Sequence, residues 1–127
     1  ENKKVSILGL AFKPETDDMR DSPCLDIIPR LQEKGIKISA FDPVAMDEAK
    51  KILKDIEFAK NMDSCLKDSD ALVILTEWNE FRSLSPSQLN GMKGNLLIDM
   101  RNALNPNSFK RSKFDLIQIG RSRKSSQ

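Results

Sequence analysis

The chain has 127 residues, which is enough for one domain with a real core and too few for two ordinary domains. Hydrophobic residues make up 39% and charged residues 31%, and the net charge is +2, so no strong field favours nucleic acid or an anionic membrane surface. No apolar run approaches the length of a bilayer span and no signal peptide precedes the first strand, so we expect a cytoplasmic protein without a membrane or nucleic-acid partner.

Histidine is absent from the sequence, and the two cysteines, Cys24 and Cys65, lie far apart. The usual zinc sites therefore lack a ligand set, and Ser-His and Cys-His nucleophile pairs are excluded. We interpret both cysteines as reduced, buried thiols, and we expect no metal site in this chain.

The first predicted strand covers residues 4–8 and is followed by a polar loop. Ser22 then caps a predicted helix that has Pro23 at its first position, and Gly35 ends it. Pro29 lies in the interior of this helix, where proline removes a backbone hydrogen bond, so we expect a kink there.

The rest of the chain alternates short apolar runs with amphipathic stretches. Further strands are predicted at residues 36–41, 56–59, 71–75, 95–99 and 114–119, and helices at 46–53, 62–66 and 84–89. This alternation predicts an α/β fold, a Rossmann-like doubly wound, mostly parallel sheet of about six strands with helices on both faces. We expect the strand order 3-2-1-4-5, with the last strand at the far edge.

Polar side chains follow three of the predicted strands. Lys13 follows strand 1, Thr76–Phe81 follows strand 4 and Arg101 follows strand 5. Because ligands of such sheets bind beyond the carboxyl ends of the strands, these loops predict a crevice for a small anionic ligand, either a nucleotide or a phosphorylated sugar. In the alternative interpretation, Lys13 is a solvated loop residue and Asp99 hydrogen-bonds loop amides.

Two further alternatives concern the same loops. Trp78 and Phe81 are as well explained by packing as by ligand contact. The acids around Arg20 fit a local salt-bridge and helix-capping cluster. Gly9 is not followed by the other glycines of G-x-G-x-x-G and no Walker A sequence occurs, so an ordinary dinucleotide or P-loop site is not predicted.

Four motifs in combination resemble one known family. They are GLAFKPETDDMRDSP from Gly9, FDP from Phe41, ALVILTEWNEF from Ala71 and IDMRN from Ile98. Together they resemble the C-terminal UDP-binding domain of the UDP-glucose and GDP-mannose dehydrogenases, and within that family they are most similar to the UDP-glucose 6-dehydrogenases. The resemblance covers residues 4–121.

The resemblance implies both a reaction and site residues. Such enzymes oxidise UDP-glucose to UDP-glucuronate with NAD, which their N-terminal domain binds. By motif, Phe12, Lys13 and Arg101 would contact the UDP-sugar, and Arg20 would face the NAD.

The N-terminal and central domains of that family, with the catalytic cysteine and the dimerisation segment, are not in this sequence. The resemblance therefore implies a substrate-binding domain at residues 1–121, inert alone, within a homodimeric parent; residues 122–127 are expected to be a disordered basic tail. The alternatives are a domain for another UDP-hexose, or a stand-alone doubly wound nucleotide-binding or signalling module. A receiver-like module is disfavoured, because it would need its lysine at a later strand end.

Overall fold

A computed structural model describes residues 3–10, 22–76 and 78–118 of the chain. Within these ranges, six strands form one sheet: β1 (Lys4–Leu8), β2 (Lys37–Phe41), β3 (Glu57–Phe58), β4 (Ala71–Ile74), β5 (Leu96–Asp99) and β6 (Asp115–Gln118). The helical segments are α1 (Cys24–Glu33), α2 (Met46–Ile52), α3 (Met62–Leu66), α4 (Asn79–Arg82), the 3₁₀ turn η1 (Pro86–Leu89) and α5 (Pro106–Phe109).

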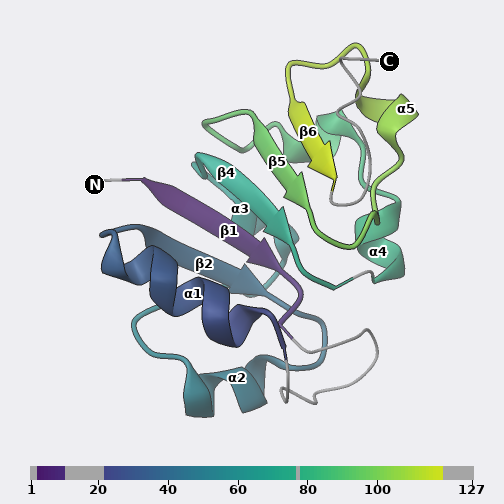
Figure 1. Cartoon of the computed structure of the whole chain (residues 1–127). Helices are drawn as coiled ribbons and strands as arrows, with labels where there is room; N and C mark the ends of the chain where they lie inside the picture. The colour runs from purple at the N-terminus through teal and green to yellow at the C-terminus, as the bar shows by residue number, and fades with distance from the viewer. Residues whose placement is uncertain (1–2, 11–21, 77, 119–127) are drawn as a thin grey trace.

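The strand order is β3-β2-β1-β4-β5-β6, and every neighbouring pair is parallel. This confirms the predicted doubly wound fold and order. The winding reverses between β1 and β4, which lie side by side at the centre of the sheet (Figure 1).

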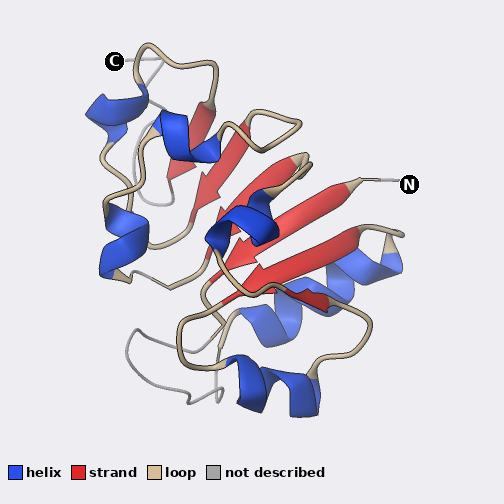
Figure 2. Ribbon diagram, turned by 180° about the vertical axis from the view of Figure 1, so that it is seen from behind, coloured by secondary structure: helices blue, strands red, loops and turns tan. Residues whose placement is uncertain are grey.

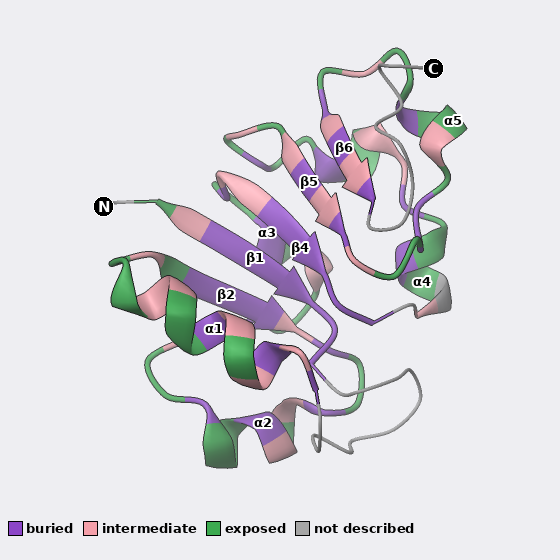
Figure 3. Ribbon diagram, viewed as in Figure 1, coloured by how far each residue is buried: buried purple, intermediate pink, exposed green. Residues whose placement is uncertain are grey.

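Helices cover both faces of the sheet, and each face has its own hydrophobic cluster. One cluster joins β1 and β4 to α1 and α2, with Ile28 and Ala49 among its fully buried residues. The other includes buried residues of α3, α4, η1 and α5. Figure 2 shows the sheet from behind, with helices in front of its strands. Between these two layers, most residues of β1, β2 and β4 are buried (Figure 3).

The first helix begins one residue later than predicted, and it is closed by Gly35 as predicted. Its N-cap residue is Pro23 rather than Ser22, whose hydroxyl donates instead to the carbonyl of Leu10. Its C-terminus is closed by Gly35, with φ +78°: the Gly35 N–H donates to Gln32 O (3.0 Å) and the Ile36 N–H to Leu31 O (3.2 Å). These are the two bonds of a Schellman motif, which satisfies the last carbonyls of a helix.

Pro29 lies inside α1, as predicted, and the helix runs without interruption from Cys24 to Glu33. The kink stays a prediction. The predicted helix at 84–89 is shorter, as η1, and the four-residue helices α4 and α5 were not predicted.

Candidate functional site: the carboxyl edge of the sheet

The two central strands meet very closely where they end. Gly9 follows β1 with φ +92°, and a Cβ atom at this position would lie 2.5 Å from both Cβ and Oγ1 of Thr76, which is buried after β4. Only glycine tolerates both this backbone conformation and this approach. The Leu75 N–H donates to Leu8 O (2.9 Å), so the two chains remain joined beyond the paired strands.

A buried carboxylate fixes the chain that leaves β1. Asp42, which follows β2 and is 1% exposed, accepts hydrogen bonds from the N–H groups of Leu10 (2.7 Å), Val44 (2.8 Å) and Ala45 (2.8 Å). The carbonyl of Leu10 in turn accepts from the Ser22 hydroxyl and from the Cys24 thiol (3.1 Å). Both backbone groups of Leu10 are thus held by residues that lie far from it in sequence.

A second buried carboxylate organises the turn after β5. Asp99 is fully buried and accepts from the N–H groups of Arg101 (3.1 Å) and Leu104 (2.7 Å), and from Nε2 of Gln118 (2.9 Å). This agrees with the interpretation in which Asp99 hydrogen-bonds loop amides. The side chain of Arg101 is exposed at the carboxyl edge.

The two aromatic residues after β4 differ in their surroundings. Phe81 is fully buried in the core cluster, so it is a packing residue. Trp78 is half-buried and packs against the same cluster, while its Nε1 atom is buried without a hydrogen-bond partner among the described residues.

The sequence-predicted site residues fall into two groups. Phe12, Lys13 and Arg20 lie outside the described residues, whereas Arg101 lies where it was expected, beyond β5. The ends of β1, β4 and β5 are neighbours in the sheet, as the prediction required. Sequence reasoning missed the roles of Asp42 and Gln118. An aspartate before proline at a strand end is a turn signal that points to Asp42, but nothing local singles out Gln118.

The two thiols are buried on opposite faces of the sheet. Burial raises the pKa of both Cys24 and Cys65. The negative charge of the nearby Asp42 carboxylate raises the pKa of Cys24 further. Both groups are therefore neutral thiols at neutral pH and poor nucleophiles. Within the described ranges, no cluster of three or more acidic, cysteine or histidine side chains is placed to hold a metal ion.

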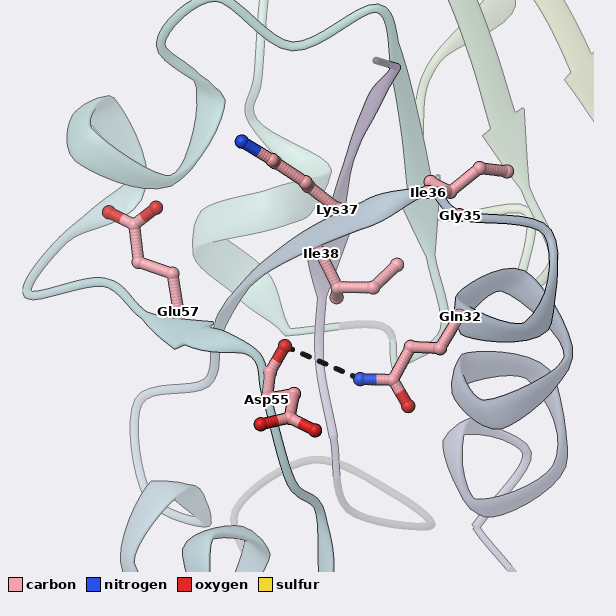
Figure 4. Close-up of a pocket in the computed structure, with 7 residues that line it drawn as sticks. All are labelled: Gln32, Gly35, Ile36, Lys37, Ile38, Asp55 and Glu57. Atoms are coloured by element: carbon pink, nitrogen blue, oxygen red, sulfur yellow. Dashed lines mark hydrogen bonds between the residues drawn. The ribbon is translucent and has the colours of Figure 1, made fainter. Parts of the chain in front are cut away.

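A hollow of about 480 Å³ lies at the opposite end of the sheet, beside the start of β2 (Figure 4). Gln32 crosses it and donates from Nε2 to the carbonyls of Lys54 (2.7 Å) and Asp55 (3.4 Å). Since parallel sheets bind ligands beyond their carboxyl ends, we do not assign the candidate site to this hollow. The described residues also form no helix long and apolar enough to cross a membrane.

Comparisons with known proteins agree with the motifs. The model of the UDP-glucose/GDP-mannose dehydrogenase family, UDP binding domain, matches residues 6–106. A UDP-glucose 6-dehydrogenase of Rhizobium meliloti is 41% identical over 93% of this chain, and the UDP-glucose 6-dehydrogenase TuaD of Bacillus subtilis is 37% identical over 95%. The chain spans only 27% of the length of each of these relatives.

Solved structures give the same result for the fold. An NDP-N-acetyl-D-galactosaminuronic acid dehydrogenase of Methanosarcina mazei matches 96% of this chain with a TM-score of 0.81 at 26% identity, over 25% of its own length. A UDP-D-ManNAc dehydrogenase of Pyrococcus horikoshii matches 94% with a TM-score of 0.74 at 26% identity, over 26% of its length.

Proposed function

The chain belongs to the UDP-glucose/GDP-mannose dehydrogenase family, as its UDP binding domain, and from this premise we propose that it binds a UDP-sugar at the carboxyl edge of its sheet. The whole protein would be an NAD-dependent UDP-glucose 6-dehydrogenase, of which this chain is the C-terminal, substrate-binding part. The observation that supports the proposal is the meeting of the β1, β4 and β5 ends, with the exposed Arg101 beyond β5.

The proposed contacts follow the chemistry of the ligand. A diphosphate suits the two-pronged guanidinium of Arg101 and the point charge of Lys13, and Phe12 would complete the contact with the substrate. Residues 1–121 would make up this binding unit. Neither cysteine is placed to act as the nucleophile, so the chain alone would bind without turning over.

NAD would accept a hydride from the sugar alcohol in the whole protein, but the described residues do not fit it here. In dinucleotide-binding folds, an acidic residue after the second strand holds the ribose. The corresponding carboxylate in this chain, that of Asp42, is buried and accepts three backbone hydrogen bonds. We therefore assign NAD to the other domains of the parent, with Arg20 facing it across the junction.

A stand-alone signalling module is the weaker candidate. A receiver-like domain needs an accessible aspartate at a strand end to accept phosphate. Asp42 and Asp99 stand at strand ends, but both are buried and their oxygens accept hydrogen bonds from protein donors.

The test is an NMR titration of the isotope-labelled chain with UDP, UDP-glucose, GDP-mannose and NAD, in which the backbone amide chemical shifts are measured. We expect saturable shifts at Thr76, Trp78 and Arg101 with UDP at about millimolar affinity, roughly −4 kcal/mol, and weaker shifts with GDP-mannose. A comparison of the affinities for UDP-glucose and for other UDP-hexoses would test which sugar the domain prefers.

Arg101→Ala is expected to lower the affinity for UDP about tenfold, because a hydrogen bond to a charged group contributes roughly 1.5–3 kcal/mol. Arg111→Ala is the matched control, since Arg111 is also exposed but precedes β6 at the amino edge of the sheet. Equal affinities of the two variants, or UDP shifts confined to the amino edge, would refute the proposed site.

A further inference from the structure

The last residues of five neighbouring strands form a row across the sheet that is apolar at one side and polar at the other. In register, it runs Phe41, Leu8, Ile74, Asp99, Gln118 from β2 to β6. Leu8 and Ile74 are buried core residues, as a doubly covered sheet requires. Asp99 and Gln118 are just as buried, at 0% and 5% exposure, although one is a carboxylate and the other an amide.

Burial of such a polar pair is unfavourable unless its groups are hydrogen-bonded. Here the pair is joined to itself and to the next turn: Gln118 Nε2 donates both to Asp99 Oδ2 (2.9 Å) and to the carbonyl of Leu104 (2.9 Å). Asp99 Oδ2 also accepts from the Leu104 N–H (2.7 Å). Both backbone groups of Leu104 are therefore held by the pair.

The turn that is held in this way carries Arg101. At its start, the Met100 N–H donates to Ile74 O (3.0 Å) and the Arg101 N–H to Asp99 Oδ1 (3.1 Å). Within it, Asn102 has φ +56°, a left-handed conformation that is uncommon outside glycine and that asparagine tolerates best. Hydrogen bonds thus fix the turn at both ends, around a residue in an uncommon backbone conformation.

We propose that Gln118, through Asp99, is a positioning residue for Arg101, and that the edge strand β6 thereby belongs to the UDP-binding site. This inference rests on the proposed function. A hydrophobic pair would fill the same row at no polar cost, so what the polar pair adds is a turn with one conformation, from which the guanidinium reaches a diphosphate. Gln118 itself contacts no ligand.

The experiment uses Gln118→Met, which keeps the length of the side chain and removes its donors. The comparison variant is Leu116→Val or Leu116→Ala, whichever has a urea midpoint closer to that of Gln118→Met. Leu116 also lies on β6 and is buried, but its apolar side chain makes no hydrogen bond to Asp99 or Gln118. UDP affinity is then measured for each variant by amide shifts.

We expect Gln118→Met to lower the affinity for UDP about tenfold and the Leu116 variant to lower it less than twofold. In an Arg101→Ala background, Gln118→Met should change the affinity less than twofold, because its effect passes through Arg101. The proposal would be overturned if the Leu116 variant lost as much UDP affinity as Gln118→Met. It would also be overturned if Gln118→Met lowered UDP affinity about tenfold in the Arg101→Ala background. In either case Gln118 would be a stabilising residue only.

A separate readout distinguishes this proposal from the function on which it rests. In the unliganded chain, Gln118→Met should speed hydrogen exchange of the Leu104 and Arg101 amides at least tenfold relative to the Leu116 variant. If the unaltered chain does not bind UDP, the proposed function fails, yet accelerated exchange still supports the positioning of the turn. Unchanged exchange would refute it whatever UDP does.

Discussion

Gly9 shows how a single residue fixes the centre of the candidate site. Its positive φ and its approach to Thr76 leave no room for a side chain. We expect Gly9→Ala to lower the free energy of unfolding by about 2 kcal/mol or more, because the strained backbone and the contact both oppose a methyl group. Urea unfolding followed by the fluorescence of Trp78, the one tryptophan in the sequence, measures this.

Gly91→Ala is the matched control for that substitution. A Cβ atom at Gly91 would have Cα of Lys67 as its nearest contact, at 3.9 Å, and the backbone φ is not positive. The control should change the free energy of unfolding by no more than about 0.5 kcal/mol. Similar midpoints for the two variants would show that the β1–β4 contact is looser than described.

At the scale of the element, Pro29 is the residue at odds with its surroundings. It lies in the interior of α1 with an exposed side chain, so the helix lacks one backbone hydrogen bond and no packing compensates for it. We expect Pro29→Ala to raise the free energy of unfolding by about 1–2 kcal/mol. The gain is less than the full helix penalty of proline, because alanine also frees the unfolded chain.

Pro106→Ala provides the comparison, since Pro106 begins α5, where proline fits the helix. That variant should gain nothing and lose up to about 1 kcal/mol. A midpoint for Pro29→Ala at or below that of the unaltered chain would mean that α1 needs its proline, for instance to hold a bend.

For the whole molecule, stability should depend on alkaline pH through the two thiols, one on each face of the sheet. The sequence has no histidine and no tyrosine, so between about pH 7.5 and 9.5 few other side chains titrate. Burial raises both thiol pKa values in the folded state. The folded chain then keeps protons that the unfolded chain loses above about pH 8.5, so stability is full below that pH and falls as the pH rises.

The expected loss is about 1 kcal/mol for each thiol by pH 9.5. Urea midpoints across this pH range measure it, and the double variant Cys24→Ala, Cys65→Ala should flatten the dependence while lowering stability at pH 7. An unflattened curve would assign the dependence to other groups.

The fold was largely predictable because apolar runs and turn residues repeat along the chain. The central strand 71–75 follows from a pattern that is local in sequence. The order around β1 follows from the right-handed crossovers that join parallel strands. The helices α4 and α5 were missed because four residues are too few to show a helical period. The family and the place of Arg101 were also predicted, and the comparisons confirm the family.

Asp42 and Gln118 escaped prediction for a different reason. The carboxylate of Asp42 binds Leu10, and the amide of Gln118 binds Asp99 and Leu104, so each role exists only once distant segments meet. Sequence periodicity carries information about faces and lengths of elements, and it says little about which buried polar groups pair across them.

The strand order also has a consequence for how the chain folds over time. Since every pairing is parallel, no two neighbouring strands are joined by a tight hairpin, and each contact closes a long loop, which slows folding relative to a helical bundle of this size. A chain made from its N-terminus can pair β1 with β2 early, whereas β4, β5 and β6 join the other side in succession. Gln118 lies on β6, the last strand to join, so the turn that carries Arg101 would be the last part of the site to acquire its shape.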